Sequence, residues 1–313
     1  MSNELNMKNI DKYYDLFDEA IMLLYDRLGI DYLQGFIRVF NDISLEQINT
    51  HQLADEDISK LEEIENEIIS LDILNEEIRK ALLLIIIKGF KHCKMNLDDL
   101  SPDYVSFIFA HLIKIISDNR RGMITVLDVN AGVGNLINLI LNNLDGNYNF
   151  IGIEKEEKVI RIAEAFSSLQ LNEISLCLND CLDNLNICAD IIIGDLDCSF
   201  QNEKYLPYEI IKKYQDSFLE KNRNDNFMIF MVDNDFFNQK GIEDFKDKFL
   251  GTICALIVLP EEFFQNKGKS ILIISQKFFE KFETLIINWP KANDSLKVYE
   301  VIDKLNDWFK KIK

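Results

Sequence analysis

Apolar residues recur at three- and four-residue spacing through the first hundred residues, the pattern of amphipathic helices. No alternating strand pattern interrupts them. The spacing predicts an all-helical N-terminal domain over residues 1–98. Its helices are expected at residues 10–28, 31–39, 58–69 and 76–91. The acidic stretch DEDISKLEEIENE is expected to form a solvated helix face.

From residue 99 onward, short runs rich in β-branched residues alternate with helical stretches, which predicts an α/β domain over residues 99–313. The runs at 253–259 and 270–275 are expected to form an antiparallel pair near the end of an otherwise mostly parallel sheet. Strands are expected at residues 124–127, 149–153, 174–178, 189–193, 227–232, 253–259, 270–275 and 284–287. The helix before the first strand is expected at residues 104–116, with others after strands at 208–219, 244–249 and the C-terminus.

The most informative run is ITVLDVNAGVGNL, which takes a buried strand through Asp128 into a glycine-bracketed turn and a helix start. Gly132 and Gly134 permit backbone conformations that side chains disfavour. Backbone N–H groups at such a helix start bind nucleotide-type cofactors. A dinucleotide fingerprint requires Gly or Ala three residues after its second glycine, and Ile137 stands there. NAD is therefore disfavoured.

This run resembles motif I of class I S-adenosylmethionine (SAM) dependent methyltransferases, particularly the N6-adenine-specific DNA methylases. These carry Asp, three residues, Gly, any residue, Gly, Asn, Leu. The resemblance implies a Rossmann-like class I methyltransferase sheet and S-adenosyl-L-methionine as cofactor. The cofactor-binding residues that it implies in motif I are Asp128, Asn130, Ala131, Gly132, Gly134 and Asn135.

Acidic residues follow the next two strands at plausible distances. Glu154 ends the second strand, where a carboxylate can accept both ribose hydroxyl protons, and Lys155 follows it. The third strand leads to Asp180 and Cys181, where the family places an acid facing the adenine amino group of the cofactor. These four residues join the expected cofactor site.

Ser101-Pro102 precedes motif I and is a natural helix entry. It also resembles the Thr-Pro element that, in N6-adenine methylases, lies against the methionine end of the cofactor. Pro102 is therefore a candidate cofactor contact, with a plain helix cap as the alternative.

The fourth strand leads into Gly194-Asp195-Leu196-Asp197-Cys198, in the place of the family's Asp/Asn-Pro-Pro-aromatic loop. There the acid or amide and the next carbonyl accept the amine hydrogens, prolines fix the carbonyl, and the aromatic ring stacks on the extruded base. Asp195 is the predicted catalytic residue. Both prolines are absent, and Cys198 takes the aromatic position. A Gram-positive subgroup with a helical N-terminal domain has Asp-Leu-Pro here, from which this chain also departs.

Two hypotheses follow. The chain is a SAM-dependent methyltransferase in which Asp195 positions an amine or other nucleophile, or it is a SAM-binding or protein-interaction protein that has lost catalysis. A dehydrogenase or another Rossmann enzyme stays as a third alternative. Each strand-end acid, taken singly, could be a solvated turn residue or a helix cap.

The formal net charge of −19 bears on the substrate, because a protein that grips nucleic acid must neutralise phosphates. Residues 1–100 carry 21 acids against 10 bases, and the rest carry 32 against 24, so neither part is basic. Nucleic acid is a possible partner with weak support, and a protein substrate is the alternative.

The six cysteines include no C-x-x-C pair, which favours buried thiols over zinc and predicts no metal. The longest apolar run, residues 81–87, is too short to span a bilayer, and no export signal is visible. No membrane association and a cytoplasmic location are therefore expected.

Overall fold

The computed structural model describes residues 5–97, 100–118, 120–185, 187–196, 198–220, 226–264, 267–277, 282–291 and 294–312. They group into two compact units. The helical unit comprises Met1–Leu100, Gly132–Asn142 and Glu157–Glu173, and the sheet unit comprises Ser101–Ala131, Asn143–Glu156 and Ile174–Lys313. The predicted domain boundary between residues 98 and 99 lies outside the described residues and stays a prediction.

Within the described residues, the helical unit contains four helices from the N-terminal part of the chain, one that follows the glycine turn and one that follows the second strand of the sheet. Phe17, Phe36 and Phe90 are fully buried or nearly so in its core, where Ile162 and Phe166 join them. The predicted N-terminal helices are confirmed, although the second runs six residues further because Phe40 and Ile43 pack against the same core. Its helices are α1 (Met7–Leu28), α2 (Tyr32–Leu45), α3 (Asp55–Ser70), α4 (Asn75–Cys93), α6 (Asn135–Asn142) and α7 (Glu157–Ser168).

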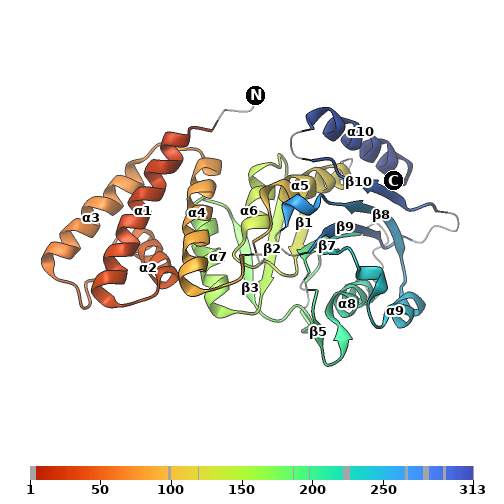
Figure 1. Cartoon of the computed structure of the whole chain (residues 1–313), viewed down its shortest axis with the longest axis horizontal. Coiled ribbons are helices and arrows are strands. Elements are labelled where there is room, and N and C mark those ends of the chain that lie inside the picture. Colours follow the sequence, from red (N-terminus) through yellow and green to blue (C-terminus); the bar gives the residue numbers. More distant parts are fainter. Residues whose placement is uncertain are drawn as a thin grey trace. The chain divides into compact units, whose positions relative to one another are not determined.

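The sheet unit contains an eight-stranded sheet in the order β10-β8-β9-β7-β4-β1-β2-β3 (Figure 1). Strand β9 is antiparallel to both of its neighbours, and the other pairs are parallel. This confirms the expected mostly parallel, Rossmann-like sheet. The strands are β1 (Ile124–Asp128), β2 (Tyr148–Glu154), β3 (Ile174–Leu178), β4 (Ile191–Asp195), β7 (Phe227–Asp233), β8 (Thr252–Val258), β9 (Lys269–Ser275) and β10 (Leu285–Asn288).

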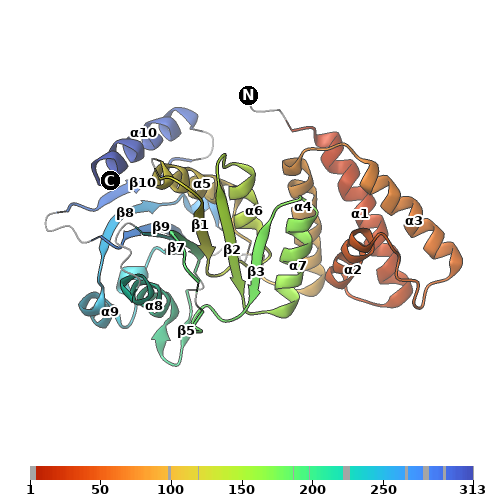
Figure 2. The same ribbon diagram turned by 180° about the vertical axis from the view of Figure 1, so that it is seen from behind.

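A two-stranded hairpin, β5 (Phe200–Gln201) and β6 (Lys204–Tyr205), follows β4 and was not expected from the sequence. Helices cover both faces of the sheet. Figures 1 and 2 show α8 and α9 on the side away from α5 and α10. These helices are α5 (Asp103–Ser117), α8 (Leu206–Glu220), α9 (Ile242–Lys248) and α10 (Ser295–Ile312). Short 3-10 helices are η2 (Phe236–Asn238) and η3 (Glu261–Phe263).

Apolar side chains of α8 and α9 pack on one face of the sheet. Ile211 of α8 and Phe245 of α9 share a buried cluster with Leu127, Ile192 and Phe230 of the strands. Among the helices that the structure describes, none is long and apolar enough to cross a membrane.

Candidate cofactor and active site

Four adjacent parallel strands each end in a carboxylic acid. Asp233, Asp195, Asp128 and Glu154 are the last residues of β7, β4, β1 and β2, which are neighbours in that order. Neighbouring strands lie about 4.8 Å apart, so four acids meet at one edge of the sheet. We call them the carboxylate row. Ligands of open α/β sheets bind outside the carboxyl ends of the strands, where the strand order reverses, and here it reverses between β4 and β1.

Asp128 occupies the middle of the row and is fully buried. Its Oδ1 atom accepts a hydrogen bond from the backbone N–H of Asn130 at 3.0 Å. Its Oδ2 atom has no hydrogen-bond partner among the residues that the structure describes. Burial raises the pKa of this carboxyl group to about 7, and the nearby charges of Asp195 and Glu154 act in the same direction. A buried acceptor without a partner is costly, so this oxygen is a natural place for a ligand's donor.

Glu154 is also buried, and its side chain is held at the sheet edge. Its Oε1 atom accepts the backbone N–H of Glu156 at 2.8 Å. Its carbonyl accepts the N–H of Asn179, and the N–H of Ala131 donates to the carbonyl of Ile153, each at 2.9 Å. The segments after β1 and β3 are therefore joined by backbone hydrogen bonds to the end of β2, at the place predicted for the cofactor.

Asp180 and Cys181 lie in the turn after β3. The Oδ1 atom of Asp180 accepts the N–H of Leu182 at 2.8 Å, the geometry of a turn residue. The carbonyl of Cys181 accepts a hydrogen bond from Lys213 of α8 at 2.6 Å. Burial, followed by the charge of Asp180, raises the pKa of the Cys181 thiol to about 11, so this thiol is neutral at physiological pH. Lys155 is exposed and close enough for its charge to oppose that shift.

The predicted catalytic residue Asp195 is joined to motif I and to a lysine from a distant segment. Its backbone carbonyl accepts a hydrogen bond from the side-chain amide of Asn130 at 2.8 Å. Its Oδ1 atom lies 2.7 Å from Nζ of Lys269, at the start of β9. Only 14% of the Asp195 side chain and 17% of the Lys269 side chain are exposed. The acid predicted to receive an amine therefore already holds one.

A second lysine forms an ion pair with Asp233, the neighbour of Asp195 in the carboxylate row. Lys267 contacts the Oδ2 atom of Asp233 at 3.1 Å, but its side chain is 65% exposed. Burial opposes charge on Lys269, yet the carboxylates of Asp195 and Asp233 outweigh burial and raise its pKa. Lys269 is therefore an ammonium ion at neutral pH.

Hydrogen bonds fix the loop after β4 without prolines. The N–H of Leu196 donates to the carbonyl of Met231 at 3.0 Å, continuing the pairing with β7. The Sγ atom of Cys198 accepts the N–H of Asp233 at 3.3 Å, so it lies against β7 where the family has an aromatic ring. Burial raises the pKa of Cys198 to about 11. Asp197 lies outside the described residues.

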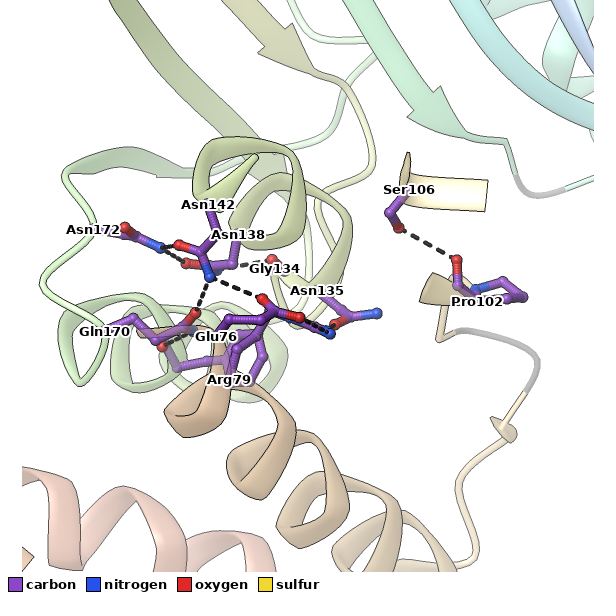
Figure 3. Close-up of polar contacts among 11 residues, drawn as sticks. Glu76, Arg79, Pro102, Ser106, Gly134, Asn135, Asn138, Asn142, Gln170 and Asn172 are labelled. Atoms are coloured by element: carbon purple, nitrogen blue, oxygen red, sulfur yellow. Dashed lines mark hydrogen bonds and ion pairs between the residues drawn. The ribbon is translucent and has the colours of Figure 1, made fainter. Parts of the chain in front are cut away.

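Pro102 is the N-cap of α5. Its carbonyl accepts the Oγ–H of Ser106 at 3.4 Å, which Figure 3 shows on the first turn of that helix. The helix-entry interpretation of Ser101-Pro102 therefore has direct support, and its role as a cofactor contact stays a prediction.

The glycines of motif I belong to the helical unit together with α6. Gly132 and Gly134 have φ angles of 53° and 81°, the left-handed region that the sequence predicted for them. A Cβ atom on Gly134 would lie 3.1 Å from Nδ2 of Asn138 and 3.5 Å from Cβ of Ala163, so this glycine also permits close packing of α6 and α7. Asn135 is buried, and its Oδ1 atom accepts a hydrogen bond from Arg79 of α4 at 2.8 Å.

Three polar residues were not predicted from the sequence to belong to this site. They are Lys269, Lys267 and Asp233. A signal was present, since an antiparallel strand that starts where its partner ends places its first residue at the carboxyl edge. Asp233 and Lys269 are such partners in the register of β7 and β9.

A family model matches the N-terminal part of this chain, and a relative matches nearly all of it. Residues 11–90 match the family model of the YtxK N-terminal helical domain. The uncharacterized protein YtxK of Bacillus subtilis (strain 168) is 27% identical over 329 aligned positions, which cover 97% of this chain and 99% of that protein.

Solved structures match the whole fold. A crystal structure of a proposed class I SAM-dependent methyltransferase from Listeria monocytogenes superposes with a TM-score of 0.84 at 22% identity, covering 97% of this chain and 100% of that one. The methyltransferase subunit of a type I restriction-modification system from Streptococcus thermophilus gives a TM-score of 0.54 at 12% identity, with 97% and 94% covered. The chain therefore has the class I methyltransferase fold, as its resemblance to that family implied.

Proposed function

We propose that this protein is a SAM-dependent methyltransferase that acts on an amine-type nucleophile. The carboxylate row carries the proposal, because four neighbouring strands end in acids at the edge where this fold binds ligands. One such acid could be a turn residue, but agreement between sequence pattern, strand order and burial is hard to explain without a ligand.

The residues of this edge fit SAM chemically. Glu154 offers a buried carboxylate to paired ribose hydroxyls, and Asp180 offers a second acceptor in the neighbouring turn. The Oδ2 atom of Asp128 needs a donor, which an ammonium group or an ordered water could provide. When bound, SAM supplies a methyl group on a sulfonium centre that a nucleophile attacks directly.

The chain's own contribution to transfer centres on Asp195. Its carboxylate can accept a hydrogen bond from an incoming amine and so hold the nitrogen in place, which is catalysis mainly by approach geometry. An amine substrate must replace Lys269 at Oδ1 or share the carboxylate with it. The carbonyl of Asp195 is oriented by Asn130 rather than by prolines.

The Lys269–Asp195 pair also favours a second candidate. If Lys269 stays paired with Asp195 permanently, Asp195 cannot receive a substrate amine. The protein then binds SAM without transferring its methyl group and acts as a SAM-binding or protein-interaction protein. The pair is largely shielded from solvent, which favours its persistence.

Nucleic acid and protein are both candidate substrates within this proposal. The resemblance to N6-adenine-specific DNA methylases favours nucleic acid, and the net charge of −19 favours protein. Binding to single- and double-stranded DNA at low salt separates them, since electrostatic affinity is greatest there.

Calorimetric titration with SAM and with S-adenosyl-L-homocysteine tests the shared prediction. Saturable binding of either is expected, and its absence from the folded protein would refute the proposal. Transfer from radiolabelled SAM to DNA, RNA and protein extracts then separates the two candidates. For an enzyme, Asp195→Ala should reduce transfer by about 100-fold or more, because the nucleophile is no longer held in place, while cofactor affinity stays within about twofold. Binding without transfer would favour the second candidate.

A further inference from the structure

A partly buried ion pair on α4, between the fully buried Arg79 and the 21% exposed Glu76, contacts both ends of α6 (Figure 3). The guanidinium of Arg79 donates through Nε and Nη2 to the two carboxylate oxygens of Glu76, each at 2.8 Å. Its Nη1 atom donates to Oδ1 of Asn135, the first residue of α6, at 2.8 Å. Glu76 also accepts from Nδ2 of Asn142, the last residue of α6, at 3.2 Å. One ion pair therefore contacts the two termini of this two-turn helix.

Side-chain amides complete the attachment of α6 within the helical unit. Nδ2 of Asn172 donates to Oδ1 of Asn138 at 2.8 Å and to Oδ1 of Asn142 at 3.1 Å. Nδ2 of Asn138 donates to the carbonyl of Gly134 at 2.8 Å and to Oγ of Ser167 at 2.9 Å. The network therefore runs from α4, through α6, back to the second glycine of motif I.

The energetics suggest that Arg79 provides orientation more than stability. Its side chain is fully buried, and a buried ion pair is often no more stabilising than apolar residues of similar volume. A guanidinium presents several donors in a rigid fork, so it can fix two partners at once. An apolar residue at this position could fill the space but could not orient the side chain of Asn135.

We propose that Arg79 is a positioning residue for cofactor binding, acting through Asn135 to hold the turn formed by Gly132, Val133 and Gly134 in its ligand-ready conformation. The helical N-terminal part of the chain thereby contributes to cofactor affinity. This inference rests on the proposed function, because it takes the glycine turn to be part of the SAM site.

The test measures the affinity for S-adenosyl-L-homocysteine in the full chain by calorimetry. Arg79→Met should raise the dissociation constant by about tenfold or more, the loss expected for a hydrogen bond to a charged group. Arg79→Lys keeps the charge but cannot hold both partners in the same geometry, so partial recovery is expected. It also serves as the test variant if Arg79→Met does not fold.

A control variant separates positioning from general weakening of the fold. Lys88→Met removes a cation of α4 that pairs with Asp18 at 2.7 Å, outside the network that holds α6. It should lower the melting temperature and leave the dissociation constant within about twofold. Asn135→Ala and the Arg79→Met/Asn135→Ala double variant complete a cycle, in which the second substitution should add little to the first.

The outcomes are distinct. If the unsubstituted protein does not bind the ligand, the proposed function fails and this inference fails with it. If the unsubstituted protein binds and both Arg79 variants bind equally well, the function stands and the inference is overturned. Equal weakening by Arg79→Met and Lys88→Met would also overturn it, since it would show a merely structural role.

Discussion

Lys269 and Asp195 form an ion pair between strands that are not neighbours, because β7 lies between β4 and β9 in the sheet. Lys269 can reach because β9 is antiparallel and begins at the edge where β4 ends. The antiparallel strand thus supplies the cation that balances the predicted catalytic acid.

Replacing Lys269 tests how much the fold depends on this balance. Lys269→Met should lower the free energy of unfolding by about 1–3 kcal/mol, since it leaves a largely buried carboxylate without its charged partner. The matched control is Lys267→Met. The Lys267 side chain is 65% exposed, so its pair with the buried Asp233 should contribute less than about 1 kcal/mol. Urea unfolding of both variants gives the comparison, and equal losses would contradict the special role of Lys269.

Glu154 is expected to hold the cofactor through two acceptor oxygens. Glu154→Gln replaces one of them by a donor and should weaken binding of S-adenosyl-L-homocysteine by about tenfold. Glu157→Gln, an exposed position paired with Arg161, should leave the affinity unchanged. Calorimetry would contradict the assignment if both variants bound the ligand like the unsubstituted protein.

A buried acidic pair makes stability depend on pH. Glu65 lies buried near Asp42, and its Oε1 atom has no partner among the described residues. Burial, followed by the charges of Asp42 and Glu62, raises the pKa of Glu65 from 4.5 to about 8. A raised pKa in the folded state means that this group's contribution is fully present below about pH 4.5 and is lost as the pH rises through 8.

Glu65→Gln should therefore stabilise the protein at pH 8.5, by about 2 kcal/mol, and have much less effect at pH 5. Thermal unfolding across this range measures the difference. The exposed neighbour in Glu63→Gln serves as the control and should keep the pH dependence of the unsubstituted protein. A Glu65→Gln variant with an unchanged pH dependence would show that Glu65 is not the responsible group.

Gly134 is expected to tolerate a side chain poorly for two reasons, its φ of 81° and its closeness to Asn138. Gly134→Ala should cost about 2–3 kcal/mol. Gly29 has a φ of 65° with open space around it, so Gly29→Ala should show the backbone term alone, about 1 kcal/mol. Chemical denaturation followed by circular dichroism measures both, and equal losses would exclude a packing role for Gly134.

The strands and the acids at their ends could be predicted because local sequence patterns determine them. Runs of β-branched residues located the strands, and the acids Asp128, Glu154 and Asp195 could be placed at strand ends because parallel strands share one carboxyl edge. The class I methyltransferase fold, with its mostly parallel sheet, then followed from the resemblance in motif I.

Long-range polar pairs could not be predicted in the same way. Arg79 and Asn135 are 56 residues apart, and Asp195 and Lys269 are 74 apart, so no periodicity links them. The β5–β6 hairpin was not predicted from the sequence for another reason. Its turn residues Asn202 and Glu203 both have positive φ angles without the glycine that normally signals such a turn.

The attachment of α6 to α4 has a consequence for how the molecule can be divided. A fragment beginning at residue 99 would look like a complete methyltransferase domain in the sequence, yet it would lose Glu76 and Arg79. Asn135 and Asn142 would lose these partners, and Ile162 and Phe166 would lose the helical core that covers them. The obvious place to cut the chain is therefore a poor one, and the glycine motif depends on residues encoded before it.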